Sequence, residues 1–290
     1  MQTVPLDPLH VPALYEIYGR ATSTAAHCRF MPSVAHFGHG LTNPARPNTR
    51  LLVAEDPGEA RGFAALLDLP PGENSVEETQ LTALFVADEL AAELLVDECL
   101  AQAGPARTFG AFPAEHGRCP VQAYNAGWDG LSDQLSLVAR VLARKGFAPV
   151  YRELHLEIAG AQFESTVSPC PAGVTIMEQT DAEGYLVVKA LVDDQQAGIC
   201  IYNPLSRVSD HPEAVEWSYI GWLHVAEAHR RRGLARHLLT YSLNRMRERG
   251  YRGCWLTTGA DNWPAQPLYF STGFRIVDAS SCWLMKRAEY

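Results

Sequence analysis

The stretch that most constrains the fold of this chain is Leu223–Leu239, which reads LHVAEAHRRRGLARHLL. A short apolar segment ends at Val225, a polar loop leads to three consecutive arginines, and apolar residues recur at helical spacing after Gly233. The first turn of a helix has backbone N–H groups without partners, and glycine lets a ligand approach the backbone closely. This strand–loop–helix order therefore predicts an anion site for a phosphate-bearing ligand. The alternative is a solvated run of arginines before an ordinary helix.

The size and charge of the chain narrow its class. At 290 residues it exceeds one typical domain, so two domains are expected. Its 47% hydrophobic and 20% charged residues are typical of a globular protein and not of a disordered one. A net charge of −9 argues against a nucleic-acid surface, which would be broadly basic. The arginines after Val225 stand out from this acidic background, which favours a small anionic ligand over a polymer.

The sequence shows neither a targeting segment nor a pattern of cysteines that indicates disulfides or a metal site. The N-terminal residues have no basic segment before an apolar one, so a signal peptide is not expected, and no apolar run is long enough to span a membrane. The seven cysteines are scattered, and none forms a C-x-x-C pair or lies at metal-ligand spacing. We therefore expect reduced, mostly buried thiols, no metal site and a cytoplasmic location.

The two halves of the chain repeat one order of elements. Each has a hairpin, a strand, a helix, a strand, a second helix that ends in Gly-Phe, and a terminal strand; Gly146-Phe147 corresponds to Gly273-Phe274. We expect an α/β fold with mixed sheets (α+β in arrangement), made of two tandem domains over residues 1–160 and 173–290. Residues 161–172, which are small, polar and rich in Pro and Gly, are the expected linker.

The halves differ where the first has VADELAAELL and the second RRRGLARHLL. Only about five residues separate Gln179 from Tyr185, so the second half has no helices between its first two strands. We expect a strand over Ala214–Val225, and two paired strands, Phe274–Asp278 and Cys282–Lys286, at the end of the chain.

These residues resemble the GNAT superfamily of N-acetyltransferases. Arg230–Ala235 fits the Gln/Arg-x-x-Gly-x-Gly/Ala signature of that family in the required strand–loop–helix context. Asn262–Phe274 fits its later pattern, Asn-x-x-Ala-x-x-Leu-Tyr followed by Gly-Phe. Both signatures fall within residues 170–290, whereas residues 45–158 match only in the order of elements and the Gly-Phe ending. The resemblance thus implies tandem GNAT-like domains, of which the first is degenerate and binds no coenzyme A.

The resemblance also implies roles for individual residues. Acetyl-CoA would lie where two parallel strands splay apart, one of them ending at Val225, with its pyrophosphate on the N–H groups of Arg231–Arg236. Tyr269 would protonate the departing thiolate, as acyl transfer from a thioester requires. Pro264 and Pro267 depart from the pattern and predict a helix that begins late, because proline fits only the first helical turn. The implied cofactor residues are Leu223, Val225, Arg230, Arg231, Arg232, Gly233, Leu234, Ala235, Arg236 and Asn262.

The general base is the least defined group. Glu216 is the only carboxylate in the expected strand Ala214–Val225, and some relatives have glutamate at the register of Tyr219. Strand alternation places Glu216 and Tyr219 on opposite faces unless a bulge intervenes. Both are candidates for catalysis. His224, His211 and Asp210 are further candidates, although each is more typical of a surface or structural residue.

The expected function is acetyl-CoA-dependent transfer of an acetyl group to a primary amine of a small molecule, with acetyl-CoA as co-substrate and no metal. The acidic chain would also suit a cationic acceptor such as an aminoglycoside or a polyamine. A non-catalytic acyl-CoA sensor, or a structural module that binds another phosphate, is the alternative. No nucleic-acid or membrane partner is expected, and the protein is expected to be a monomer or a homodimer.

Overall fold

The computed structural model divides the chain into two compact units. Unit 1 comprises Met1–Glu153 and Asp278–Tyr290, and unit 2 comprises Leu154–Val277. Both boundaries fall inside strands, namely β7 (Ala148–Ala159) and β13 (Arg275–Lys286). The structure describes residues 1–43, 48–69, 78–103, 108–112, 130–163, 166–182, 184–207 and 209–286.

The division differs from the expected linker at residues 161–172. That segment lies inside unit 2, because β7 continues to Ala159 and the 3-10 helix Gly160–Phe163 follows it directly. Ser168 then binds the side of helix α5 (Leu234–Glu248): the Thr240 hydroxyl accepts its N–H at 3.0 Å. The composition of this stretch indicated a linker, but these contacts make it part of a domain.

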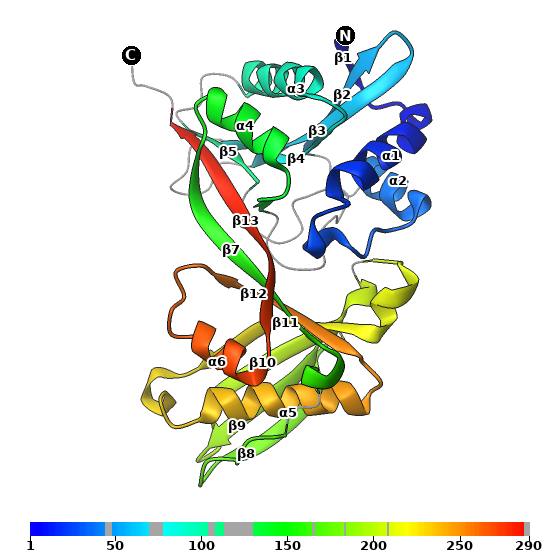
Figure 1. The fold of residues 1–290 in the computed structure, drawn as a ribbon. Coiled ribbons are helices and arrows are strands. Elements are labelled where there is room, and N and C mark those ends of the chain that lie inside the picture. Colours follow the sequence, from blue (N-terminus) through cyan, green and yellow to red (C-terminus); the bar gives the residue numbers. More distant parts are fainter. Residues whose placement is uncertain are drawn as a thin grey trace. The chain divides into compact units, whose positions relative to one another are not determined.

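Unit 1 has a sheet in the order β1-β2-β3-β4-β5-β13, in which β4 and β5 are parallel and the other neighbours antiparallel. Helices α1 and α2 cover one face and α3 lies on the other (Figure 1). Tyr18 and Phe37 pack against Phe63 and Phe85, with ring centroids 5.0–5.9 Å apart, which fixes α1 and α2 on the sheet. The elements are β1 Gln2–Pro5, α1 Val11–Thr22, α2 Val34–Thr42, β2 Thr49–Asp56, β3 Glu59–Leu69, β4 Glu78–Val86, α3 Glu89–Gln102, β5 Thr108–Ala111, β6 Leu131–Ser132 and α4 Ser136–Arg144.

Unit 2 has strands in the order β12-β11-β10-β9-β8, with only β11 and β12 parallel. Helix α5 lies along one face of β9, β10 and β11 (Figure 1). Residues 181–185 alone connect β8 to β9, so the expected lack of helices at this point is confirmed. The elements are β8 Thr175–Thr180, β9 Leu186–Val192, β10 Gln195–Pro204, β11 Trp217–Val225, α5 Leu234–Glu248, β12 Gly253–Gly259 and α6 Gln266–Thr272.

Several expected element boundaries are wrong. The strand expected from Ala214 begins at Trp217, because Pro212–Glu216 forms a 3-10 helix capped by the His211 side chain. The two terminal strands are one, β13. Strand β1 was not expected, because residues 1–45, which prolines interrupt, look helical but irregular in sequence. Helix α6 begins at Gln266, as the prolines predicted.

The same β-bulge occurs in both units, which confirms the internal repeat. Between β10 and β11 the pairing slips at Ile201/Tyr202, which leaves Gly221 as the extra residue. Between β3 and β4 it slips at Ala65/Leu66, which leaves Thr82 extra. Each extra residue lies four positions before the last valine of its strand. A bulge reverses the facing of the residues that follow it, so each unit changes the faces of its strand at the same place.

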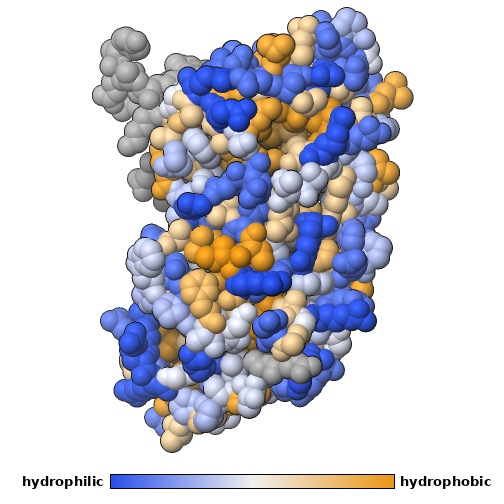
Figure 2. Space-filling model, viewed as in Figure 1, coloured by the Kyte–Doolittle hydropathy of each residue, from blue (hydrophilic) through white to orange (hydrophobic). Residues whose placement is uncertain are grey.

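The surface and the thiols fit a globular protein. On the face drawn in Figure 2, hydrophilic residues are mixed with smaller hydrophobic patches. In the described ranges no helix is long and apolar enough to cross a bilayer. The cysteines there are free, and all but Cys170 are buried, as the sequence predicted; Cys119 lies outside the described residues.

Candidate active site

Strands β11 and β12 separate partway along their length. Their parallel pairing runs from Trp217↔Gly253 to Ile220↔Leu256 and then stops, although β11 continues to Val225. The bulge at Gly221 immediately follows the last pair. Beyond it, β11 and β12 are no longer paired with each other, so the facing backbone groups of the two strands do not bind one another as they do before the bulge.

The backbone of the free part of β11 is oriented toward this opening. The carbonyl oxygen of His224 lies 3.1 Å from the position of a Cβ on Gly198, and the N–H of Ala226 donates to the adjacent β10 residue at 2.9 Å. Both groups therefore point to β10. Because polar groups alternate along a strand, those of Leu223 and Val225 point toward β12. Leu223 and Val225, two of the implied cofactor residues, thus direct their backbone polar groups to the side of β12.

The loop from Val225 to α5 ends in an open helix N-terminus. Arg231 and Gly233 have left-handed backbone conformations, with φ of +61° and +83°. Turns with left-handed residues make concave sets of N–H groups that bind anions. Gly233 is the N-cap residue of α5 and supplies no side-chain hydrogen bond, so the N–H groups of Leu234 and Ala235 are available to a phosphate.

The arginines of this loop have different partners. Arg230 donates from Nε to the Val225 carbonyl at 2.9 Å and so ties the loop to the end of β11. Arg236, in the first turn of α5, donates to the Ser271 hydroxyl on α6 at 2.6 Å. Arg231 and Arg232 are exposed, and in the described part of the chain neither forms an ion pair with a carboxylate. They leave positive charge beside the open helix end.

The second predicted motif forms the turn from β12 into α6. Asn262 donates its side-chain N–H to the Thr258 hydroxyl at 3.0 Å and its backbone N–H to the Gly259 carbonyl at 3.0 Å. Tyr269, 8% exposed, packs edge-on against Phe274 with ring centroids 6.0 Å apart. The left-handed Gly273 ends the helix, and Phe274 donates its N–H back to the Tyr269 carbonyl at 3.1 Å. The proline-rich start of the helix leaves this Tyr-Gly-Phe packing intact.

Tyr219 and Glu216 occupy different environments. The Tyr219 hydroxyl lies 3.3 Å from the Thr257 hydroxyl of β12, next to the point where the strands separate. Glu216 precedes β11, is 39% exposed and forms an ion pair with Arg252 at 3.2 Å. It therefore lies at the far end of the strand from the anion loop. Among the other base candidates, His211 caps the 3-10 helix and His224 stacks on Trp222.

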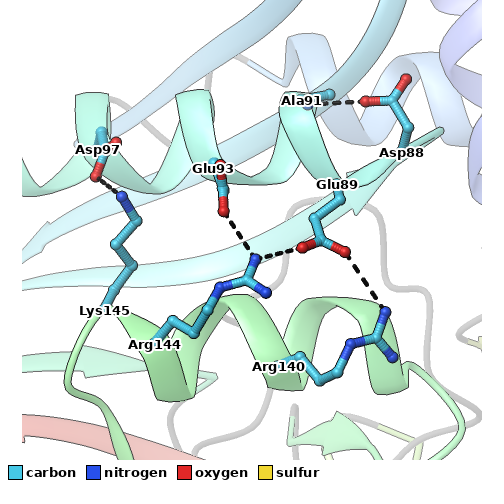
Figure 3. Close-up of polar contacts among 8 residues, drawn as sticks. All are labelled: Asp88, Glu89, Ala91, Glu93, Asp97, Arg140, Arg144 and Lys145. Carbon is cyan, nitrogen blue, oxygen red and sulfur yellow. Dashed lines mark hydrogen bonds and ion pairs between the residues drawn. The ribbon is translucent and has the colours of Figure 1, made fainter.

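The helix start of unit 1 that corresponds to the anion loop is closed. Only two residues, Ala87 and Asp88, separate β4 from α3, whereas eight, 226–233, separate β11 from α5. The Asp88 carboxylate accepts the Ala91 N–H at 2.9 Å (Figure 3). It also binds Arg61 at 2.5 Å. Burial raises the pKa of Asp88, but the Ala91 N–H and the Arg61 guanidinium outweigh this and hold that pKa below its usual value. A carboxylate thus occupies the position where a phosphate would bind.

Ion pairs also join α3 of unit 1 to α4 (Figure 3). Arg144 bridges Glu89 and Glu93 at 2.6 and 2.8 Å, and Lys145 binds Asp97 at 2.5 Å. The acidic residue of the first turn of α3, Glu89, is thus held at the helix start by arginines of α4, and these arginines are paired with carboxylates rather than left for an anionic ligand.

The counterpart of Tyr269 in unit 1 has no hydroxyl. Phe147 donates its N–H to the Leu142 carbonyl at 3.0 Å around the left-handed Gly146, the geometry that Phe274 makes with Tyr269. Counting back along both helices, Asn262 corresponds to Leu135. Unit 1 keeps the fold of this motif and lacks its polar groups.

Sequence reasoning missed the side chains that support the site. Thr257 and Thr258, which contact Tyr219 and Asn262, lie in the strand GCWLTT with no signal beyond their polar end position. Ser271 was likewise not singled out, because its bond to Arg236 joins two helices. In the described residues no cluster of His, Cys, Asp or Glu is arranged as a metal site.

Comparison with known proteins gives a family match in unit 2. Residues 152–274 match the acetyltransferase (GNAT) family. No curated protein matches the sequence. In solved structures, this chain aligns over 98% of its length with the GCN5-related glucosamine N-acetyltransferase region of a fungal multi-domain GH3 β-N-acetylglucosaminidase, at 13% identity and a TM-score of 0.72; it spans 38% of that chain.

Two further structures match across both units. A tandem GNAT protein from the clavulanic acid biosynthesis pathway aligns with 100% of this chain and 99% of its own, at 16% identity and a TM-score of 0.65. A GCN5-related N-acetyltransferase from Sphaerobacter thermophilus aligns with 99% of this chain and 96% of its own, at 15% identity and a TM-score of 0.60. At these identities the likeness is one of fold.

Proposed function

We propose that this tandem-domain member of the GNAT acetyltransferase superfamily transfers the acetyl group of acetyl-CoA to a primary amine of a small molecule. The observation that carries this proposal is the contrast between two helix starts. The α5 start in unit 2 is uncapped beside splayed strands, whereas the α3 start in unit 1 is closed by Asp88.

The residues present fit acetyl-CoA. We infer that the pantetheine arm binds along Leu223 and Val225, with Asn262 at its side, and that the pyrophosphate lies on the first N–H groups of α5. Arg231 and Arg232 add charge-assisted contacts to the phosphates. Arg230 holds the loop in place through Val225.

The reaction follows from this placement. The amine nitrogen attacks the thioester carbonyl, the N–C bond forms, the C–S bond breaks, and the thiolate takes a proton from the Tyr269 hydroxyl. The nitrogen loses its surplus proton to water, and the Tyr269 phenolate takes a proton back from water before the next turnover. Tyr219, rather than Glu216, lies beside the end of the paired strand segment, so we assign Tyr219 to the acceptor side of the reaction.

The test is release of free thiol from acetyl-CoA in the presence of a panel of primary amines. We expect amine-dependent thiol release and an acetamide product that mass spectrometry detects. Calorimetric binding of acetyl-CoA with no turnover on any amine would instead support a non-catalytic sensor. Absence of acetyl-CoA binding would exclude both.

We propose further that unit 1 binds no coenzyme A and serves as the degenerate copy. Asp88, the acidic first turn of α3 and Leu142 support this assignment. We also infer that the protein acts in the cytoplasm as a monomer or homodimer.

A further inference from the structure

Several buried polar atoms of unit 2 have no hydrogen-bond partner among the described residues, and one of them lies beside the candidate catalytic position. The side-chain oxygen Oδ1 of Asn203, near the end of β10, is buried and accepts no hydrogen bond. Native proteins rarely leave a buried acceptor unsatisfied, and such a group needs an explanation such as a ligand.

Asn203 lies beside the candidate catalytic position. It is the ladder partner of Tyr219, and directly opposed residues of antiparallel strands present their side chains to the same face. The Tyr219 hydroxyl in turn lies 3.3 Å from the Thr257 hydroxyl on β12. Three adjacent strands thus place polar side chains in one row, next to the last pair, Ile220↔Leu256, before the strands separate.

This row belongs to the face of the sheet opposite α5. Tyr202 and Ile220 pack in the core under α5, so their neighbours Asn203 and Tyr219 face the other way. Past the bulge, Trp222 and His224 join that face, and Trp222 is 57% exposed with its ring stacked on His224. On β9 to β12 this face carries Val187, Lys189, Ile199, Ile201, Asn203, Trp217, Tyr219, Trp222, His224, Trp255 and Thr257. On β7, the neighbour of β12, it carries His155, whose ring contacts that of Trp255, and Glu157.

The charge of this face limits what binds there. On β9 to β12 the one permanent charge of this face is the cation Lys189. The carboxylate that β7 adds, Glu157, is buried and already paired with Arg275 at 2.8 Å. A polycation would therefore meet a like charge at Lys189 and a carboxylate whose charge is already compensated. An amine on an apolar or aromatic body would instead bury its body against Trp222 and its aliphatic neighbours.

We infer that Asn203 is a positioning residue for the acceptor: its Oδ1 accepts an N–H of a single primary amine whose apolar or aromatic body lies against Trp222. This inference rests on the proposed function. An uncharged amide oxygen suits catalysis, because a carboxylate at this point would favour the ammonium form, which is no nucleophile.

The test uses Asn203→Leu and Asn203→Asp in the full chain, with 2-phenylethylamine as the probe amine and spermidine as the polycationic comparison. Asn203→Leu removes the acceptor atom at similar volume, and we expect its KM for 2-phenylethylamine to rise about tenfold while its KM for acetyl-CoA and its Tm do not worsen. Asn203→Asp keeps an acceptor atom and should hold the KM for 2-phenylethylamine within about threefold. Wild type should prefer 2-phenylethylamine to spermidine.

Tyr202→Phe is the matched control. It removes the other orphaned polar atom of β10, the Tyr202 hydroxyl, on the opposite face, and should leave both KM values unchanged. Three results would overturn the inference: an unchanged KM for 2-phenylethylamine in Asn203→Leu, equal increases in its KM values for 2-phenylethylamine and acetyl-CoA, or a preference of the wild type for spermidine.

Calorimetric titration of 2-phenylethylamine into the CoA-bound protein separates this inference from the proposed function. Binding that Asn203→Leu weakens, without turnover, would refute only the proposed function, and no binding by wild type would refute the inference.

Discussion

Leu142 of unit 1 holds the place that Tyr269 holds in unit 2, because each gives its carbonyl to the N–H of a phenylalanine five residues later around a left-handed glycine. The helix end, the glycine and the phenylalanine are retained, and an aliphatic side chain replaces the phenol ring and its hydroxyl. At the other motif, Asp88 fills the helix start that Gly233 leaves open. Unit 1 thus has the residues that form the fold of these motifs, but it lacks those that would bind acetyl-CoA and protonate the departing thiolate.

This relationship predicts one acetyl-CoA per chain. Calorimetric titration should give a stoichiometry of about one, and Gly233→Asp, which supplies a carboxylate where Asp88 does, should abolish binding. Aspartate tolerates the left-handed conformation better than most residues, so the effect reports charge more than strain. Gly250→Asp, at the far end of α5 with φ of +90° and open space around it, is the control. Residual binding in Gly233→Asp would indicate a site in unit 1.

Removal of the Tyr269 hydroxyl should slow the chemical step. We expect Tyr269→Phe to lower kcat by about 10²-fold with little change in KM for acetyl-CoA, because phenylalanine retains the packing against Phe274. Tyr251→Phe, a half-buried tyrosine of the same unit, should leave kcat unchanged. Equal kcat values for Tyr269→Phe and wild type would exclude Tyr269 as the proton donor.

The two motifs could be predicted because their signals are local. The loop before α5 and the turn into α6 depend on residues within a few positions of one another, such as Gly233 and Gly273 with their positive φ. The cap on α3 is local in the same way: Asp88 and the N–H that it binds are three residues apart.

Features that depend on strand register could not be predicted. The bulge at Gly221 changes which face Trp222 presents, and simple alternation from Tyr219 would have placed it under α5. Glu216 was expected on β11, but the helix that starts at Pro212 replaces the first part of that strand. The orphaned oxygen of Asn203 follows from the pairing of β10 with β11, which a pattern of apolar residues does not specify.

Mutation should distinguish the two candidates for the general base, Tyr219 and Glu216, by their effects on kcat/KM. We expect Tyr219→Phe to lower kcat/KM for the acceptor about tenfold, because it removes a hydroxyl from the row with Thr257. Glu216→Gln breaks an exposed ion pair with Arg252, so it should change kcat/KM less than about twofold and stability by about 0–1 kcal/mol. Steady-state kinetics over an amine series decides between them. A large loss in Glu216→Gln with an active Tyr219→Phe would reverse the assignment.

The Asp88 cap predicts a pH-dependent contribution to stability. Burial raises the pKa of Asp88 in the folded state, but the Ala91 N–H and Arg61 lower it by more, so it lies below the usual value. The ionised carboxylate therefore stabilises the fold fully above the unfolded pKa of about 3.9, and this stabilisation is lost as the pH falls through the pKa of the folded state. Asp88→Ala should cost about 1 kcal/mol in urea unfolding at pH 7. Asp88→Asn keeps a capping oxygen without the charge, so its deficit should appear at pH 7 and shrink below about pH 3. Asp97→Asn, 57% exposed on the same helix, controls for loss of a surface charge. A deficit in Asp88→Asn that is constant from pH 7 to pH 3 would show that the ionised carboxylate does not stabilise this helix start.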